Sequence, residues 1–275
     1  MADRHEKEKE PILLGRRDAL GALSAFGPLF ALGCGSAASA SPSDSGDAAI
    51  GDTATGGVAD AGTRSEAAAD TCTEIPDETG GPYPDVDGMI FNTKYQRVDI
   101  TEGLKGTPLT LTLQVVDVSK GCTPVVGARV IIWHCDANGV YSEYANAMNT
   151  DTAQNDVGST STTYLRGWQV TDATGTVKFT TIYPGWYTPR VTHIHVMVYN
   201  PSDLTTPVKT TQFCFPDATN ATVYGQTSLY QKGQNSTTNA TDQVFGATTE
   251  SLLAAVTGST ASGYAASLPV RLATY

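Results

Sequence analysis

Apolar and polar residues alternate along much of the chain from residue 108 onward. In residues 108–118, leucines and valines at every second position are separated by threonine and glutamine. This two-residue period is typical of a β-strand with one buried face. Similar runs, rich in β-branched and aromatic residues, predict further strands at 125–134, 164–171, 176–182, 191–199 and 210–215.

The spacing of these runs favours antiparallel pairing. Turn-forming clusters such as 172–175 and 200–203 separate several of them. A parallel sheet would need long crossover connections, usually helices, and the spacing leaves no room for them. The clearest helical segment, 248–256, is short and lies late in the chain. We therefore predict an all-β fold, an antiparallel β-sandwich with little helix, over residues 71–275.

The first 34 residues predict a signal peptide. A charged segment that carries Arg16 and Arg17 is followed by an apolar, glycine-rich run, 19–33, that is short for a membrane span. The paired arginines resemble a twin-arginine export signal. Residues 31–34 (Ala-Leu-Gly-Cys) resemble a bacterial lipobox, in which Cys34 would be acylated; ordinary cleavage nearby, releasing a soluble protein, is the alternative. We expect an exported protein, periplasmic or at the cell surface, anchored to the membrane by a lipid on Cys34.

Residues 35–70 differ in composition from the rest of the chain. They are almost entirely Ala, Ser, Gly, Asp and Thr, with too few large apolar side chains to offset the entropy of ordering them. We predict a disordered tether here. The 275-residue chain has a formal net charge of -11 and no basic block or basic–aromatic stripe, which argues against a nucleic-acid partner.

Four cysteines follow the tether, at 72, 122, 135 and 214. An even number in an oxidising compartment indicates disulfides. Cys72 lies at the start of the predicted domain and Cys122 lies in a Gly-Cys-Thr-Pro loop, so we predict that these two pair. Cys135 and Cys214 lie in predicted strands, where a bridge and two buried free thiols both stay open.

Two of the four histidines, His193 and His195, lie two residues apart in the strand predicted at 191–199. Side chains alternate along a strand, so both imidazoles lie on one face and can bind one ion. Such a pair alone is more often a polar surface feature or a hydrogen-bonded part of the core. Here Tyr187 and Arg190 stand just upstream, and a turn after the strand at 125–134 presents Tyr141.

Two tyrosines together with two histidines favour a particular metal. Zinc sites seldom use phenolate, and no cysteine or carboxylate nearby completes a zinc set. Phenolate is a hard anionic donor that suits a trivalent ion, and the ion must drive its deprotonation because the ordinary pKa of tyrosine is ~10. Imidazole is also a ligand that iron accepts. The residue types therefore predict a mononuclear Fe(III) site with positions open for water and substrate.

Three segments resemble consecutive blocks of the intradiol ring-cleavage dioxygenases: 133–142 (WHCDANGVYS), 164–195 (YLRGWQVTDATGTVKFTTIYPGWYTPRVTHIH) and 211–217 (TQFCFPD). The resemblance covers about residues 76–217. Enzymes of this family cleave catechols between the two hydroxylated carbons, using O₂ and non-haem ferric iron. The resemblance implies one Fe(III) per chain, bound by Tyr141, Tyr187, His193 and His195.

The resemblance also implies roles for other residues. Arg190 would stabilise negative charge on the substrate, Gln212 would lie near the substrate and oxygen pocket, and Tyr187 would accept a substrate proton. Family members often carry Glu-Gly-Pro-Tyr and a second aromatic near the start of the domain, where this chain has Gly80-Gly81-Pro82-Tyr83-Pro84. Tyr83 is retained and is expected to line the substrate pocket.

The predicted function is Fe(III)-dependent intradiol cleavage of a small aromatic diol by O₂ to a muconate-type dicarboxylic acid. No helical N-terminal domain of the kind found in cytosolic catechol enzymes is visible, so the chain resembles the smaller, exported branch. The alternative is a non-catalytic exported β-sandwich that binds catecholic ligands or iron. Retention of Arg190 and Gln212 argues for the enzyme, because binding alone would not need that arginine.

Overall fold

The computed structural model describes residues 72–84, 88–146, 148–151, 156–226 and 228–275, which fall in one compact unit, 64–275. The predicted signal peptide with Cys34 and the predicted tether at 35–70 lie outside these ranges. None of the helices found in them is long and apolar enough to cross a membrane.

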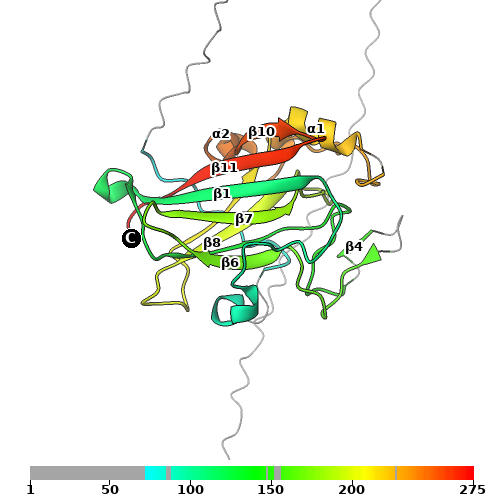
Figure 1. Cartoon of the computed structure of the whole chain (residues 1–275). Helices are drawn as coiled ribbons and strands as arrows, with labels where there is room; N and C mark the ends of the chain where they lie inside the picture. The colour runs from blue at the N-terminus through cyan, green and yellow to red at the C-terminus, as the bar shows by residue number, and fades with distance from the viewer. Residues whose placement is uncertain (1–71, 85–87, 147, 152–155, 227) are drawn as a thin grey trace, which may run out of the picture. The chain divides into compact units, whose positions relative to one another are not determined.

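Most of the ordered elements are strands (Figure 1). The strands are β1 (Pro108–Asp117), β2 (Thr123–Pro124), β3 (Arg129–Trp133), β4 (Thr150–Asp151), β5 (Asp156–Val157), β6 (Arg166–Val170), β7 (Thr176–Ile182), β8 (His193–Tyr199), β9 (Lys209–Cys214), β10 (Ala255–Ser259) and β11 (Gly263–Leu272). The helices are α1 (Asp217–Tyr224) and α2 (Thr249–Leu252). Short 3-10 helices lie at Met89–Phe91, Thr93–Tyr95, Val118–Lys120, Asn239–Thr241 and Gly246–Thr248.

The strands form two main sheets, so the predicted β-sandwich is confirmed. One sheet has the order β10-β11-β1-β2, with β7 also paired to β1, and the other has the order β6-β3-β8-β9. β4 and β5 form a separate pair. The pairing is antiparallel except between β1 and β11, which run parallel from Leu109↔Tyr264 to Asp117↔Leu272. The whole second sheet lies between these two strands in the chain, and this supplies the long connection that a parallel pair needs.

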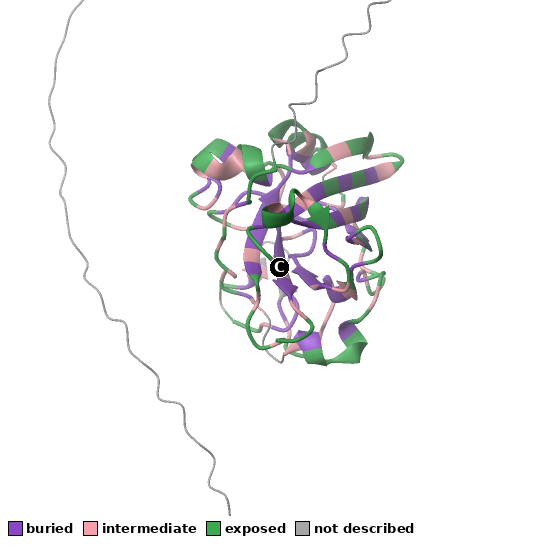
Figure 2. Ribbon diagram, turned by 90° about the vertical axis from the view of Figure 1, so that its left-hand side faces the viewer, coloured by how far each residue is buried: buried purple, intermediate pink, exposed green. Residues whose placement is uncertain are grey.

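The alternation predicted for 108–118 corresponds to β1. Leu109, Leu111, Leu113 and Val115 are buried, and Thr110 and Gln114 between them are exposed. The buried leucines of β1 belong to the main core between the two sheets. Val130 of β3 and Ile194 of β8 belong to the same core. Figure 2 shows the buried residues running along the strands in the interior.

A second apolar cluster lies on the other face of the β6-β3-β8-β9 sheet. Val130 and Ile132 of β3 belong to the main core, whereas the alternating Ile131 and Trp133 belong to this second cluster. It also contains Tyr83 and Tyr141. Loops and the short 3-10 helices Met89–Phe91 and Thr93–Tyr95 cover this sheet face.

The predicted helix at 248–256 is wrong in extent. α2 ends at Leu252, and the chain then joins the sheet as β10 from Ala255. Pairing with β11 gives Ala255–Ser259 backbone hydrogen bonds along one edge, and this outweighs a local preference for helix.

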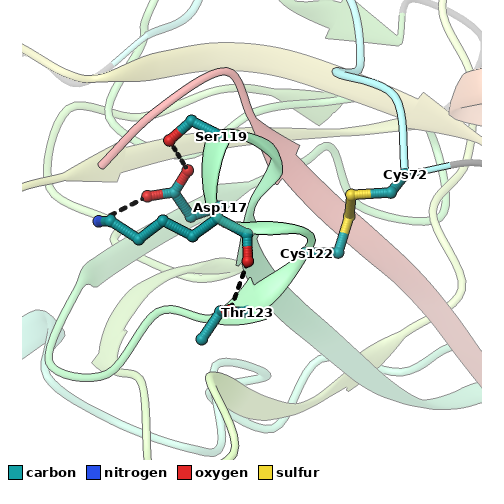
Figure 3. Close-up of a disulfide and its surroundings, with 6 residues drawn as sticks. Cys72, Asp117, Ser119, Cys122 and Thr123 are labelled. Carbon is teal, nitrogen blue, oxygen red and sulfur yellow. Dashed lines mark hydrogen bonds and ion pairs between the residues drawn. A yellow bond between two sulfur atoms is a disulfide. The ribbon is translucent and has the colours of Figure 1, made fainter.

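Cys72 and Cys122 form the disulfide expected between them (Figure 3). Cys135 and Cys214 are buried free thiols, so the bridge left open for them is absent. Burial raises the pKa of the Cys214 thiol to about 12, and it raises that of Cys135 still further. Neither thiol is therefore ionised at neutral pH.

Candidate active site

The two histidines lie on the loop-covered face of β8. Ile194, Val196 and Val198 point into the core between the sheets, and His193 and His195 point the opposite way. Both imidazoles are at most 2% exposed, and their ring centroids are 4.9 Å apart. The strand therefore brings the pair together on one face, as the alternation predicts.

His195 is held between an aromatic side chain and the backbone. Trp133 is its register partner on β3, and the two rings stack 4.7 Å apart with only 3° between their planes. On the ring's edge lies Gly81, where an added Cβ would come within 2.8 Å of Cε1 of His195. Nδ1 of His195 is buried and has no hydrogen-bond partner among the described residues. The ring is thus positioned by packing alone.

Tyr141 follows a tight turn after β3. The Asp136 carboxylate accepts hydrogen bonds from the backbone N–H groups of Asn138 and Val140 and so closes this turn. Asn149 then clamps the tyrosine backbone: its Oδ1 accepts from the Tyr141 N–H, and its Nδ2 donates to the Tyr141 carbonyl, each at 2.7 Å. The Tyr141 side chain is fully buried in the second cluster.

Tyr187 comes from a second turn, which packs against the first. The Gly185 N–H donates to the Asp136 carbonyl at 2.9 Å. A Cβ at position 185 would approach the Ala137 carbonyl oxygen to 2.4 Å, so only glycine allows this backbone contact. The contact joins two segments almost fifty residues apart and directs both tyrosines toward β8.

The two phenol hydroxyls converge on one ring nitrogen, Nε2 of His193, and the ring of His195 lies next to this imidazole. The Tyr141 hydroxyl lies 3.4 Å from Nε2 of His193, and the Tyr187 hydroxyl lies 3.5 Å from the same atom. His193 Nδ1 donates to the Val191 carbonyl at 2.6 Å, which leaves the lone pair on Nε2. The two oxygen–nitrogen distances exceed those of good hydrogen bonds. These atoms therefore face a common space, and together the four side chains can hold a metal ion.

Burial makes the neutral form of each of the four groups the stable one. It lowers the pKa of His193 to about 3, with a further contribution from Arg190, and it lowers the pKa of His195 well below its ordinary value. Burial also raises the pKa of Tyr187 to about 12 and raises that of Tyr141 well above its ordinary value. At neutral pH the imidazoles have free lone pairs, and the phenols keep their protons unless a cation replaces them.

Arg190 is buried beside these groups in a fixed orientation. Its Nε donates to the Asp242 carboxylate, with an N–O distance of 2.9 Å to Oδ2, and its Nη2 donates to Oε1 of Gln212 at 2.8 Å. Asp242 also accepts from the Val191 N–H, and Gln212 donates to the Thr79 carbonyl. Gln212 lies across from His195 in the β8–β9 register, so both predicted residues lie next to the histidines.

A cavity of about 380 Å³ opens beside Tyr187 and Arg190. Tyr83 lines it, as the sequence predicts, and packs against Tyr141 with ring centroids 4.7 Å apart. The remaining lining residues are Thr79, Gly81, Pro82, Met148, Thr188, Pro189, Gln243 and Val244. The cavity thus extends from Tyr187 to the exposed Met148.

Two residues that shape the site, Asp242 and Asn149, are not predicted from the sequence. Asp242 pairs with Arg190 from 52 positions away, and Asn149 holds Tyr141 from a loop. Nothing in the local sequence of either residue points to such a role. His134 and Cys135, next to the Tyr141 turn, are not part of the tyrosine–histidine group. Both ring nitrogens of His134 already have hydrogen-bond partners, the Cys135 carbonyl and the Thr181 hydroxyl.

Comparisons with known proteins support one family. A protein-family model described as "Dioxygenase" matches residues 81–261. The intradiol ring-cleavage dioxygenase from Tetranychus urticae superposes with a TM-score of 0.62 at 26% identity, over 73% of this chain and 95% of that one. The dioxygenase domain of a dioxygenase–carbohydrate-binding protein fusion from Streptomyces sp. SirexAA-E superposes with a TM-score of 0.50 at 26% identity, over 72% and 96% of the two chains. A search of curated proteins finds no match. The family match over most of the folded domain and the sandwich shared with these structures show that the chain belongs to the intradiol ring-cleavage dioxygenases.

Proposed function

We propose that this protein is an Fe(III)-dependent dioxygenase that cleaves a catechol-type aromatic between its two hydroxylated carbons. Both atoms of O₂ enter the product, a muconate-type dicarboxylic acid. The observation that carries the proposal is the convergence of the Tyr141 and Tyr187 hydroxyls on Nε2 of His193, beside His195. Three separate segments of the chain supply these groups.

The donor set fits ferric iron. Two buried phenols are costly to ionise unless a cation stands next to them, and two phenolates would cancel most of the charge of a trivalent ion. The neutral imidazole of His193 already presents Nε2 toward the phenol oxygens because its Nδ1–H is held by Val191. When bound, ferric iron would supply Lewis acidity that favours the ionised diol and activates its ring toward O₂.

Tyr187 is the phenol placed to exchange a proton with the substrate. It is half-buried and lines the cavity, whereas Tyr141 is fully buried and does not line it. A diol entering the cavity therefore meets the Tyr187 oxygen, which in its phenolate form can accept a proton from a substrate hydroxyl. Tyr83 forms the adjacent wall and confines the aromatic ring.

Arg190 supplies positive charge at the cavity wall. The bonds to Asp242 and Gln212 hold its guanidinium in place before the substrate arrives, so no reorganisation is needed when negative charge develops on the ring. Its side chain is only 4% exposed, which keeps water from screening the interaction.

The proposal is tested on purified, iron-loaded protein. Phenolate-to-Fe(III) charge transfer should colour the protein red, with one iron per chain, and the colour should shift on addition of catechol. Oxygen uptake should accompany conversion of catechol to a dicarboxylic acid. A protein that stays colourless with ferric salt would exclude the metal site, and a coloured protein that consumes no O₂ with any catechol would be a binding module.

Replacing Tyr187 by phenylalanine tests its role directly. We expect the charge-transfer band to shift and kcat to fall about 100-fold, because the phenolate that accepts the substrate proton is removed. Tyr264→Phe is the matched control: it deletes a hydroxyl from β11, in the core between the sheets, and should leave colour and kcat unchanged. An unchanged spectrum of the Tyr187→Phe protein would exclude Tyr187 as a ligand.

A further inference from the structure

The rim of the cavity differs in character from its buried end. At the buried end, Tyr83 and Arg190 are nearly inaccessible to solvent. At the rim, Met148 is 79% exposed, and Pro82 and Pro189 are also exposed. Val244 is half-buried beside them. Apolar surface of this kind lies where a substituent on the substrate ring would extend toward solvent.

The described lining residues offer a substrate one positive charge. Arg190 is the only charged side chain among the described lining residues, and Asp242 and Gln212 already engage its guanidinium. The proposed reaction uses this guanidinium to stabilise negative charge on the ring, so a carboxylate on a ring substituent would find no second cation among the described lining residues.

The cavity is also larger than a bare catechol requires. Its volume of about 380 Å³ lies in the range of pockets that enclose drug-sized ligands. Tyr141, His193 and His195 do not line it, so this space adjoins the cluster rather than forming its interior. A ring held beside Tyr187 would leave room for a substituent along Met148 and Val244.

We propose that the site takes uncharged catechols carrying an apolar ring substituent and discriminates against catechols that carry a carboxylate. The proposal rests on the function proposed above and names the substrate class of that site. The apolar rim favours the substituent by removing its surface from water. The carboxylate is disfavoured because no second cation among the described lining residues offsets its desolvation.

The test compares two ligands of similar size: catechol with an ethyl group and catechol with a carboxylate at the same ring position. Calorimetry on the full-length, iron-loaded protein without O₂ should show about tenfold tighter binding of the ethyl compound. Kinetics with O₂ should show the same order in kcat/KM. Equal or tighter binding of the carboxylated compound, or binding of neither, would overturn the proposal. Tight binding of the ethyl compound without turnover of any catechol would instead contradict the dioxygenase function.

Gln243→Lys tests the charge argument. Gln243 is exposed at the rim, so the change should not disturb folding, and the new cation should improve binding of the carboxylated compound about threefold relative to the ethyl compound. Gln114→Lys, on an exposed position of β1 in the other sheet, is the matched control and should leave the ratio unchanged. An equal ratio in the two variants would contradict the role of charge at the rim.

Met148→Gln tests the apolar contact. It keeps the length of the side chain and makes its end polar, and we expect the preference for ethylcatechol over unsubstituted catechol to fall several-fold. The dissociation constant of unsubstituted catechol serves as the internal reference. An unchanged preference would show that Met148 does not contact the substituent.

Discussion

At position 81 the backbone passes so close to His195 that no side chain fits between them. Gly81 has a φ of 72°, in the left-handed region, and an added Cβ would come within 2.8 Å of the imidazole Cε1. The ring cannot move aside easily because Trp133 stacks on its face. A single glycine thus contributes to the orientation of a proposed metal ligand.

Gly81→Ala should therefore impair the site more than it impairs the fold. We expect a loss of about 1 kcal/mol in the free energy of unfolding from the left-handed backbone, together with a marked loss of bound iron and of the red colour. Gly103→Ala is the control, because Gly103 has a φ of 80° and nothing within 4 Å of the added Cβ. It should lower stability similarly and leave the iron content unchanged. Equal iron content in both variants would contradict the positioning role of Gly81.

The sequence predicts the aromatic and imidazole groups of the site better than the groups that hold them. His193, His195, Tyr187 and Arg190 are close together in the chain, so local periodicity places them near one another. Asp242 directly follows the 3-10 helix Asn239–Thr241, in a segment without a periodic pattern. Only the tertiary fold brings it to Arg190. Such partners depend on how distant loops pack, which residue spacing does not encode.

Among the elements, the strands with regular alternation are those that the sequence predicts. β1, β7 and β8 lie within or coincide with the runs at 108–118, 176–182 and 191–199. β11 is missed: it alternates buried and exposed residues, but its buried positions include Ala266, and Pro269 lies within it. Alanine and proline weaken a strand pattern, and the partner that stabilises β11 is the distant strand β1.

The last residue of β1 carries a carboxylate whose ionisation supports the fold (Figure 3). Asp117 is buried and accepts hydrogen bonds from Lys120, from the Ser119 hydroxyl and from the Tyr275 N–H. The bond from Lys120, followed by that from Ser119, lowers the pKa of Asp117 from 3.8 to about 2. Because the folded state favours the carboxylate, the stabilisation is present above pH 4 and disappears as the pH falls toward 2.

Asp117→Asn should accordingly destabilise the protein at pH 7 and much less at pH 2. The measurement is chemical denaturation of both proteins across this range, with the difference in unfolding free energy plotted against pH. We expect this difference to shrink between about pH 4 and pH 2, as Asp117 of the unmodified protein becomes protonated. A difference that stays constant over the range would show that the charge of Asp117 does not contribute.

The disulfide secures the segment that leads to the cavity. After Cys72, the Ile75 N–H donates to the Arg271 carbonyl of β11, and the Glu78 N–H donates to the Thr210 carbonyl of β9. The segment then reaches Gly81 and Tyr83 at the site. Cys122 thus ties the start of this segment to the loop after β1.

Replacing both Cys72 and Cys122 by serine should lower the unfolding free energy by about 2–4 kcal/mol, because the cross-link restricts the unfolded chain. Thermal denaturation measures the effect. Reductant should destabilise the unmodified protein to the same extent and leave the double variant unchanged. A double variant as stable as the unmodified protein, or one that reductant still destabilises, would contradict this role of the Cys72–Cys122 bridge.

At the scale of the whole molecule, the disulfide and the predicted export signal both fit the same kind of compartment, an oxidising one. Disulfides persist in oxidising compartments, and the bridge between Cys72 and Cys122 suits a protein that has left the cytosol. The site residues all lie between Thr79 and Val244, inside the compact unit 64–275 and beyond the predicted tether. We therefore propose that residues 1–70 determine where the protein resides and that the domain determines its chemistry.

Cys34→Ala tests this division of roles. If Cys34 carries a lipid, the unmodified protein should remain with carbonate-washed membranes, and the variant should appear in the soluble fraction. Its kcat and iron content should be unchanged, because every proposed ligand lies in the domain. Ser36→Ala, two residues away, is the matched control and should stay on the membrane. Soluble unmodified protein would indicate ordinary cleavage near Cys34, and a membrane-bound Cys34→Ala variant would show that the apolar run at 19–33 is retained as the anchor.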